Sequence, residues 1–311
     1  MPELPEVEHL RRSLDPVVVG ASVRSVHIAR REVISVPKGQ RRTTDLERSL
    51  LVGSRIVATL RKGKQMALES DSGRMLVVQL GMTGSVTIEQ GSEPAGMDGK
   101  HRHVVWELVP ATNAGTGAPV RMAFRDPRRF GGLTAYPTRA DLDRAWSELG
   151  PDGLTLLGDE LASRLKGSRR PIKSALLDQG VVAGVGNIYA DESLFASSIH
   201  PLHRADRLAP DQIQRLAVEI RRILNHAADA GGSTLRDYRD AFGQPGDAAQ
   251  LHAAYGRAGE PCLRCGAILK GIRLQGRATV FCPCCQHLST KSKAVLGRKK
   301  RSRKLPPKKG S

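Results

Sequence analysis

Residues 261–286 read PCLRCGAILKGIRLQGRATVFCPCCQ, and this stretch contains all five cysteines of the chain. Four of them form two Cys-x2-Cys pairs, Cys262 with Cys265 and Cys282 with Cys285. Two such pairs with 16 residues between them are typical of a four-thiolate zinc site, because two short knuckles bring four sulfurs together without a large core. The intervening residues 268–281 predict two short strands joined at Gln275-Gly276. We therefore predict one structural Zn²⁺ and a zinc finger over residues 261–287.

Two alternatives to this ligand set stay open at the level of sequence. The cysteines could form disulfides or a redox site, although a cytoplasmic chain disfavours disulfides. Cys284 lies beside Cys285, so the second knuckle could instead be Cys282-x-Cys284.

The composition indicates a globular protein with a polyanionic partner. The chain has 311 residues, of which 40% are hydrophobic, and this length suggests about two domains. Its net charge is +18; residues 286–311 hold ten of the 49 Lys and Arg and no acid, so the remainder still carries +8. Such a balance favours nucleic acid as partner, although the tail alone could serve only solubility.

No targeting or membrane segment is evident in the sequence. No apolar run approaches the ~20 residues of a membrane helix. The start, MPELPEVEHL, lacks the basic and then apolar order of a signal peptide. We therefore expect no membrane association and a cytoplasmic location.

The pattern of residues divides the chain into four parts. Residues 1–136 contain mainly strand-like runs, and residues 137–260 change to helical periodicity. The clearest helices are Ala140–Leu149 and Pro210–Ala230, and Leu176–Phe195 predicts two helices around a turn at 184–187. Residues 261–287 are the zinc finger, and residues 288–311 are expected to be a disordered basic tail because they cannot form a core.

The N-terminal residues carry a second chemical signal. Removal of Met1 would expose Pro2 as a free secondary amine, and an α-amino group has a pKa of about 7.7–8.0. Such an amine attacks an aldehyde-level carbon to give an iminium ion, with Glu3 placed to act as acid and base. Simple capping of a helix by proline and acidic residues is the alternative interpretation of these residues alone.

Several further motifs follow in a fixed order. They are PELPEVE at 2–8, LGMTGS at 80–85, DPRRFG at 126–131, GVGNIYADE at 184–192 and YGR at 255–257, ahead of the zinc knuckles. Together they closely resemble the bacterial formamidopyrimidine-DNA glycosylase family from Pro2 to about Gln286. The resemblance implies an α+β multidomain fold: an N-terminal β-sandwich, a helix–two-turn–helix domain and a C-terminal zinc finger.

The resemblance also implies the catalytic residues. Pro2 would be the nucleophile at C1′ of the damaged nucleotide, and Glu3 would donate and accept protons. Lys64 and Arg277 match the family residues that hold the phosphate beside the lesion, and Arg277 would aid the final elimination.

DNA-binding residues follow from the same resemblance. Asn187 begins a helix whose backbone N–H groups suit a phosphate. His101, Arg128 and Arg169 match DNA contacts, with Arg170 as the alternative to Arg169. Extrusion of the target nucleotide leaves a gap, and Met82, Arg128 and Phe130 match the residues that fill it.

The implied function is base-excision repair of double-stranded DNA. The enzyme would remove oxidised purines, 8-oxoguanine and formamidopyrimidines, through a Pro2 Schiff base and then cleave the strand by β,δ-elimination. We expect a monomer in the bacterial cytoplasm, associated with the nucleoid.

Two departures from the family pattern leave the damage preference open. Gln79 stands where many relatives have His, and residues 241–250 match the loop over the flipped base only in their Gly-x-Pro-Gly core. One alternative is an endonuclease VIII-like enzyme for oxidised pyrimidines, against which the PELPEVE start argues. Another is a non-catalytic zinc-dependent nucleic-acid-binding protein, which would need neither Pro2 nor Glu3.

Overall fold

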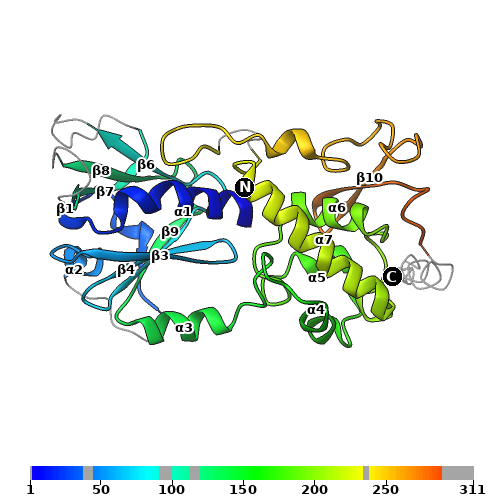
Figure 1. Cartoon of the computed structure of the whole chain (residues 1–311), viewed down its shortest axis with the longest axis horizontal. Helices are drawn as coiled ribbons and strands as arrows, with labels where there is room; N and C mark the ends of the chain where they lie inside the picture. Colours follow the sequence, from blue (N-terminus) through cyan, green and yellow to red (C-terminus); the bar gives the residue numbers. More distant parts are fainter. Residues whose placement is uncertain (1, 38–44, 91–99, 112–118, 234–237, 289–311) are drawn as a thin grey trace, which may run out of the picture.

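The computed structural model of the chain describes residues 2–37, 45–90, 100–111, 119–233 and 238–288. A sheet-rich half and a helical half lie side by side, and the N-terminus lies where they meet (Figure 1). The basic tail predicted at 288–311 lies outside the described residues except for Leu288.

The sheet-rich half contains two sheets. The four-stranded sheet has the order β1-β7-β8-β6 and is antiparallel throughout. The five-stranded sheet has the order β2-β9-β5-β4-β3, in which only the pair of β2 and β9 is parallel. The strands are β1 Ser22–Ile28, β2 Ile34–Ser35, β3 Ile56–Lys62, β4 Gln65–Ser70, β5 Met75–Gln79, β6 Ser85–Gln90, β7 Arg102–Val109, β8 Val120–Arg125 and β9 Gly132–Tyr136.

Helix α1, Leu4–Val18, packs with both sheets around one core. Its apolar residues Val7, Leu10, Leu14 and Val18 recur at helical spacing and are buried in that core. Because the same core includes Trp106 from β7 and residues of β4 and β5, the two sheets form the expected sandwich. Two short helical segments, η1 Arg31–Val33 and α2 Leu46–Ser49, connect the strands.

The helical half surrounds a second core. Its elements are α3 Arg139–Ser147, α4 Gly158–Leu165, α5 Ile172–Leu176, α6 Asn187–Ala196, η2 Ala205–Arg207, α7 Pro210–Asp229 and η3 Ala248–Leu251. Helix α7 buries residues spaced three and four apart, among them Leu216, Ile220 and Leu224. Leu4 of α1 also belongs to this core, so the start of the chain is fixed between the two halves.

One helix predicted from the sequence is wrong. The segment after Leu176 is a loop up to Gly186, whereas the periodicity predicted that the helix continued. The side chain of Gln179 explains the loop, because it accepts from the N–H of Gly184 and donates to the carbonyl of Val185. These side-chain bonds replace the backbone bonds of a helix.

The C-terminal unit is a hairpin with a small core of its own. Strands β10 Lys270–Leu274 and β11 Arg277–Phe281 pair around the predicted turn at Gln275-Gly276. Phe195 of α6 packs in the same core as Leu269 and Val280, which attaches the hairpin to the helical half. Among the described residues, no helix is long and apolar enough to span a bilayer.

Candidate active site and zinc centre

Pro2 lines an open cavity where the two halves of the molecule meet. Pro2 is buried, and the cavity has a volume of about 230 Å³. The other lining residues are Gly63, Lys64, Gln65, Gln79, Leu80, Gly81, Phe130, Leu149 and Gln179. Three of the residues assigned from the sequence, Pro2, Lys64 and Phe130, are therefore brought to one cavity.

The Glu3 carboxylate is held by the N-terminus of α6. Its two oxygens accept from the N–H groups of Gly186 at 2.7 Å, Ile188 at 2.9 Å and Tyr189 at 3.4 Å. The partial positive charge of a helix N-terminus stabilises a carboxylate at this position. Glu3 thus occupies the N–H groups of Gly186, Ile188 and Tyr189, whereas the phosphate expected at Asn187 stays a prediction.

A second carboxyl group, Glu6, lies directly behind Glu3. Its Oε2 accepts from the backbone N–H of Glu3 at 2.7 Å. Its Oε1 accepts from the N–H of Ser233 at 2.6 Å and the hydroxyl of Tyr189 at 2.7 Å. Burial raises the pKa of Glu6, and the negative charge of Glu3 raises it further, although these hydrogen bonds oppose the shift.

Lys64 lies in the turn that joins β3 to β4, and this turn is fixed by Asp152. Arg61 forms a bidentate pair with Asp152, at 2.7 and 2.8 Å, and Asp152 also accepts from the N–H of Gly63 at 2.8 Å. Burial lowers the pKa of the Lys64 ammonium group, Glu3 opposes this effect, and the positive charge of Arg277 adds to it. The charges of two other candidate catalytic residues, Glu3 and Arg277, therefore act on Lys64.

Arg277 is the exposed first residue of β11, and a buried ion pair fixes the strand behind it. Lys173 Nζ lies 2.8 Å from Asp191 Oδ1 and donates to the carbonyl of Ala278 and the hydroxyl of Thr279, each at 2.9 Å. The Asn187 side chain donates to the same carbonyl of Ala278 at 3.1 Å. Asn187 and Arg277 are thus held at one junction between α6 and the zinc hairpin.

The three candidate gap-filling residues project from two adjacent loops. Met82 and Phe130 are 40% and 59% exposed, which agrees with residues available to another molecule rather than core residues. The guanidinium carbon of Arg128 lies 5.0 Å from the centre of the Phe130 ring.

Asp126 joins these two loops. It is fully buried and accepts from the hydroxyl of Thr83 at 2.6 Å and from the N–H groups of Arg128 at 3.2 Å and Gly131 at 2.7 Å. The loops are also in direct backbone contact, since a Cβ on Gly81 would lie 2.4 Å from the backbone of Phe130. One carboxylate thus sets the relative position of all three exposed side chains.

The remaining two DNA-binding candidates occupy different places. His101 is exposed with φ of +71°, and its carbonyl accepts from the N–H of Asp126 at 3.1 Å, so it adjoins the gap-filling loops. Arg169 is exposed on the turn between α4 and α5, and no contact among the described residues joins it to the cavity. Arg170 forms an ion pair with Asp178 at 2.9 Å, which leaves Arg169 the better candidate for DNA.

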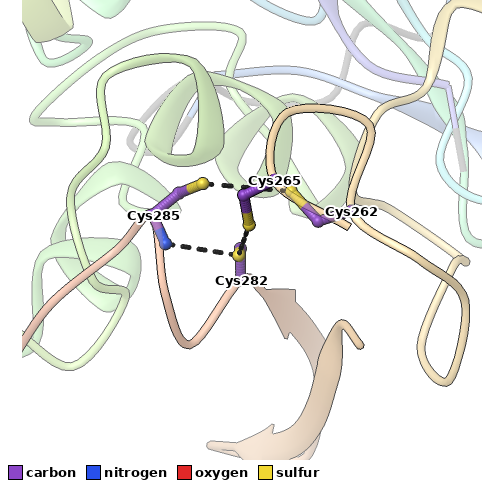
Figure 2. A group of neighbouring side chains, drawn as sticks. All are labelled: Cys262, Cys265, Cys282 and Cys285. Atoms are coloured by element: carbon purple, nitrogen blue, oxygen red, sulfur yellow. Dashed lines mark hydrogen bonds between the residues drawn. The ribbon is translucent and has the colours of Figure 1, made fainter. Parts of the chain in front are cut away.

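Four cysteine sulfurs gather at the base of the hairpin. The Sγ atoms of Cys262, Cys265, Cys282 and Cys285 all lie within 4.8 Å of one another and point toward a common centre (Figure 2). The separations of 3.5 Å between Cys265 and Cys282 and 3.9 Å between Cys262 and Cys285 are close to the ~3.8 Å expected of a tetrahedral zinc–thiolate site. The residues therefore fit a structural Zn²⁺.

Backbone groups complete the surroundings of these sulfurs. The N–H of Arg264 lies 3.4 Å from Cys262 Sγ, and the N–H of Cys285 lies 3.3 Å from Cys282 Sγ. Cys284 is exposed and does not belong to the cluster. With four sulfurs the site has no open position, so its role is structural.

The residues that support the site were not identified from the sequence. Asp126 bonds the loop of Met82 across 43 positions, Asp152 bonds the turn of Lys64 across 89, and Lys173 bonds the strand of Arg277 across 105. Asp126 and Tyr189 lie within the motifs DPRRFG and GVGNIYADE, beside candidate residues. This adjacency is the signal by which the sequence could have identified them.

Comparison with known proteins gives matches along almost the whole chain. Three family models match: the formamidopyrimidine-DNA glycosylase N-terminal domain at 1–133, the formamidopyrimidine-DNA glycosylase H2TH domain at 149–239, and the zinc finger found in FPG and IleRS at 259–288.

Full-length relatives and solved structures agree with these models. Formamidopyrimidine-DNA glycosylase of Thermomicrobium roseum is 41% identical over 300 residues, covering 93% of this chain and all of the relative. The MutM (FPG) protein of Thermus thermophilus has a TM-score of 0.77 and 36% identity, covering 93% of this chain and all of that one. Lactococcus lactis FPG in complex with DNA containing Fapy-dG has a TM-score of 0.78 and 30% identity, covering 92% and 100%.

Proposed function

The chain belongs to the formamidopyrimidine-DNA glycosylase family, and we propose that its Pro2, Glu3 and Lys64 carry out the glycosylase and lyase chemistry of that family on oxidised purines. The protein is a DNA glycosylase and abasic-site lyase of base-excision repair with a structural zinc finger. The observation that carries the residue assignment is the Glu3 carboxylate, bound by the N-terminus of α6 and adjacent to Pro2 at the cavity that Lys64 lines.

The first step is attack of the Pro2 amine on C1′ of the extruded nucleotide. The bond between C1′ and the base breaks, and its electron pair leaves with the base, which takes up the proton that the amine loses. Glu3 supplies a proton to the sugar as the ring opens, and the amine and C1′ are left joined as an iminium ion. The fixed position of Glu3 favours this step, because it costs no reorganisation during the reaction.

The next steps use the iminium ion as an electron sink. Loss of a proton from C2′ expels the 3′ phosphate, and a second elimination expels the 5′ phosphate. Lys64 and Arg277 are suited to hold the phosphate during these steps, because Arg277 lies close enough to Lys64 for its positive charge to lower the pKa of the Lys64 ammonium group. Asn187 supports that phosphate site by binding the strand that carries Arg277.

The exposed loops bind the DNA around the lesion. Met82 and Phe130 fill the space left by the extruded nucleotide, and Arg128 faces the base left without its partner. His101 and Arg169 contact the phosphate backbone, which gives affinity without sequence preference.

Oxidised purines are the substrates that we propose. The neighbouring Lactococcus lactis protein was solved with Fapy-dG in its DNA, and another neighbour, described as MutM, with carbocyclic 8-oxo-G. These ligands belong to those proteins, and they support the same class of substrate for this chain at 30–31% identity.

A substrate panel tests this function. Duplexes that carry 8-oxoguanine opposite cytosine, Fapy-dG or thymine glycol are incubated with excess enzyme, and base release is measured separately from strand cleavage. We expect both purine lesions to be released faster than thymine glycol. Faster release of thymine glycol would instead assign the endonuclease VIII-like activity, and no release of any lesion would favour the non-catalytic alternative.

Glu3→Gln separates the roles of the two catalytic residues. It should slow base release about 10²-fold or more while cleavage of a pre-formed abasic site is reduced less, because that substrate has already lost its base. Equal loss of both activities would contradict the assigned role of Glu3.

The remaining proposals concern the protein as a whole. We propose domain boundaries at 136/137 and 260/261, a monomer, and action in the cytoplasm at the nucleoid. Light scattering with and without a lesion duplex tests the monomer: a complex of one chain per duplex is expected, and two chains per duplex would contradict it.

A further inference from the structure

A continuous chain of hydrogen bonds leads from the Glu6 carboxyl group through the protein interior. Glu6 Oε1 lies 2.7 Å from the Tyr189 hydroxyl, which lies 3.1 Å from Ser233 Oγ, which in turn lies 2.9 Å from His252 Nε2. Tyr189 is 1% exposed and Ser233 is 5% exposed, so the middle of this chain is shielded from solvent.

The inner end of the chain is at the candidate active site. Glu6 Oε2 accepts the backbone N–H of Glu3, which places the carboxyl group against the peptide bond between Pro2 and Glu3. The N–H of Ser233 donates to Oε1 as well, so the position of the carboxyl group does not depend on the Tyr189 hydroxyl alone.

The outer end opens into a second cavity, which residues of α6 and α7 line. This cavity has a volume of about 250 Å³, and both Tyr189 and His252 line it. It shares no lining residue with the cavity of Pro2.

Every link in this chain can reverse its direction. With the proton on Glu6, the carboxyl group donates to Tyr189, Tyr189 donates to Ser233, and Ser233 donates to the unprotonated Nε2 of His252. With Glu6 ionised, Nε2–H of His252 donates to Ser233 and the other bonds point back to Glu6. Three protons each move by one bond between these states, and the net result is transfer of one proton from Glu6 to His252.

We propose that Glu6, Tyr189, Ser233 and His252 form a proton relay, which moves a proton between Glu6, directly behind Glu3, and the second cavity, and so changes the charge beside Glu3 while DNA covers the first cavity. This inference rests on the proposed function, because Glu3 exchanges protons in each turnover. Since the negative charge of Glu3 disfavours ionisation of Glu6, Glu6 takes up a proton through the relay when Glu3 is ionised and releases it when Glu3 is protonated. DNA bound over the cavity of Pro2 would limit the access of water to it, whereas the second cavity is lined by other residues.

The charged groups around both ends are compatible with proton exchange. Burial raises the pKa of Glu6 and lowers the pKa of His252, so neither end holds its charge strongly. The charges of Glu192 and Glu3 oppose the shift at His252. The other titratable or charged side chains at the second cavity are Arg222 and His226 from α7 and Arg264 from the zinc knuckle, and the Tyr255 ring packs edge-on at 5.8 Å from the His252 ring.

The test compares two tyrosines that both contact Glu6. Tyr189→Phe removes a hydroxyl within the relay, whereas Tyr238→Phe removes one that donates to the backbone carbonyl of Glu6, at 2.8 Å, and not to its carboxyl group. Ser233→Ala and His252→Gln break the relay at its other members. For the full chain and each variant, the single-turnover rate of base release is measured across pH, in H₂O and in D₂O.

A relay predicts a specific pattern in these rates. Tyr189→Phe, Ser233→Ala and His252→Gln should each lower the rate about 10-fold, alter the pH profile and increase the solvent isotope effect, because proton uptake and release by Glu6 become limiting. The Tyr189→Phe/Ser233→Ala double variant should be no slower than either single variant, since both break the same path. Tyr238→Phe should match the parent chain.

Other outcomes separate failure of the relay from failure of the function. Parent-like pH profiles and isotope effects in all three relay variants would overturn the relay, as would effects that multiply in the double variant. His252→Gln keeps the test valid if an interior variant does not fold, because His252 is partly exposed. Absence of a borohydride-trapped Pro2 adduct in the parent chain would instead refute the proposed function.

Discussion

Gly186 donates its backbone N–H to the Glu3 carboxylate at 2.7 Å, although the two residues are 183 positions apart in the chain. A Cβ built on Gly186 would lie 2.3 Å from Cδ of Glu3, so only glycine permits this approach. The contact fixes the N-terminal residues of the sheet-rich half against the first turn of α6. The catalytic geometry is therefore a product of the junction between the two halves rather than of either half alone.

Gly186→Ala should displace the Glu3 carboxylate. We expect base release to fall about 10²-fold, which is the lower range for loss of a positioned acid or base, while binding of a lesion duplex changes little. Gly180→Ala is the matched control, because its Cβ would lie 3.3 Å from the nearest atom, Asp178 Oδ1. Single-turnover release and duplex affinity are measured for both; equal rates would contradict the role given to this contact.

Asp126→Asn should loosen the two loops that carry Met82, Arg128 and Phe130. The new amide would present a donor to the backbone N–H of Gly131 or to that of Arg128, and an unpaired buried donor costs about 1–3 kcal/mol. We expect the free energy of unfolding, measured with urea, to fall by this amount, and lesion release to become about 10-fold slower. Asp143→Asn, whose carboxylate is exposed and pairs with Arg139, should change neither quantity. If Asp143→Asn lowers both as strongly as Asp126→Asn, Asp126 does not bridge the two loops as described.

Loss of zinc should weaken DNA binding while the rest of the chain stays folded. Cys265→Ser removes one of four clustered sulfurs and should abolish metal binding and weaken DNA binding, since the hairpin that positions Arg277 then loses its base. Cys284→Ser should keep one Zn²⁺ per chain in metal analysis. Loss of zinc in Cys284→Ser but not in Cys285→Ser would reverse the ligand assignment.

Glu8 should make stability depend on pH in the acid range. Burial alone raises the pKa of its carboxyl group, but hydrogen bonds from Arg11, Arg12 and Arg61 outweigh this effect and lower the pKa from 4.5 to about 2. The folded state therefore binds fewer protons than the unfolded state, so the stabilisation is complete above pH 4.5 and is lost as the pH falls toward 2.

Glu8→Gln tests this dependence. It should destabilise the chain by about 3 kcal/mol at pH 7, and the difference from the parent should shrink below pH 4.5, as measured by urea unfolding. Acid release of zinc affects both chains alike and cancels in the difference. Asp229→Asn, an exposed partner of Arg12, should show little effect at any pH, and a constant difference for Glu8→Gln would contradict the pKa assignment.

The sequence predicted the overall fold because its strongest signals are local. Cysteine spacing located the zinc unit, and the resemblance to the glycosylase family gave the β-sandwich and helical parts, which the family models and solved structures confirm. Strand β9 begins at Gly132 directly after Gly131, a pair that is typical of a turn, so its start gives no local signal for a strand. The loop after Leu176 was missed because Gln179 stabilises it through side-chain bonds that periodicity does not report.

The sequence predicted only those site residues that lie within recognisable motifs. Pro2, Glu3 and the cysteines are contained in short recognisable stretches. The partners of these residues are distant in sequence: Arg61 pairs with Asp152, and Lys173 holds the strand of Arg277. Only folding brings such pairs together, so no local pattern could have given the use of the α6 N-terminus by Glu3 or the path from Glu6 to His252.

The covalent role of Pro2 is the central claim, and borohydride trapping tests it most directly. The enzyme is incubated with an abasic-site or 8-oxoguanine duplex and borohydride, and the adduct is digested and mapped by mass spectrometry. We predict one adduct on the amine of Pro2, nearly abolished by Pro2→Gly or by retention of Met1. An undiminished adduct when Pro2 is blocked, or an adduct mapped to an internal lysine such as Lys64, would contradict the account.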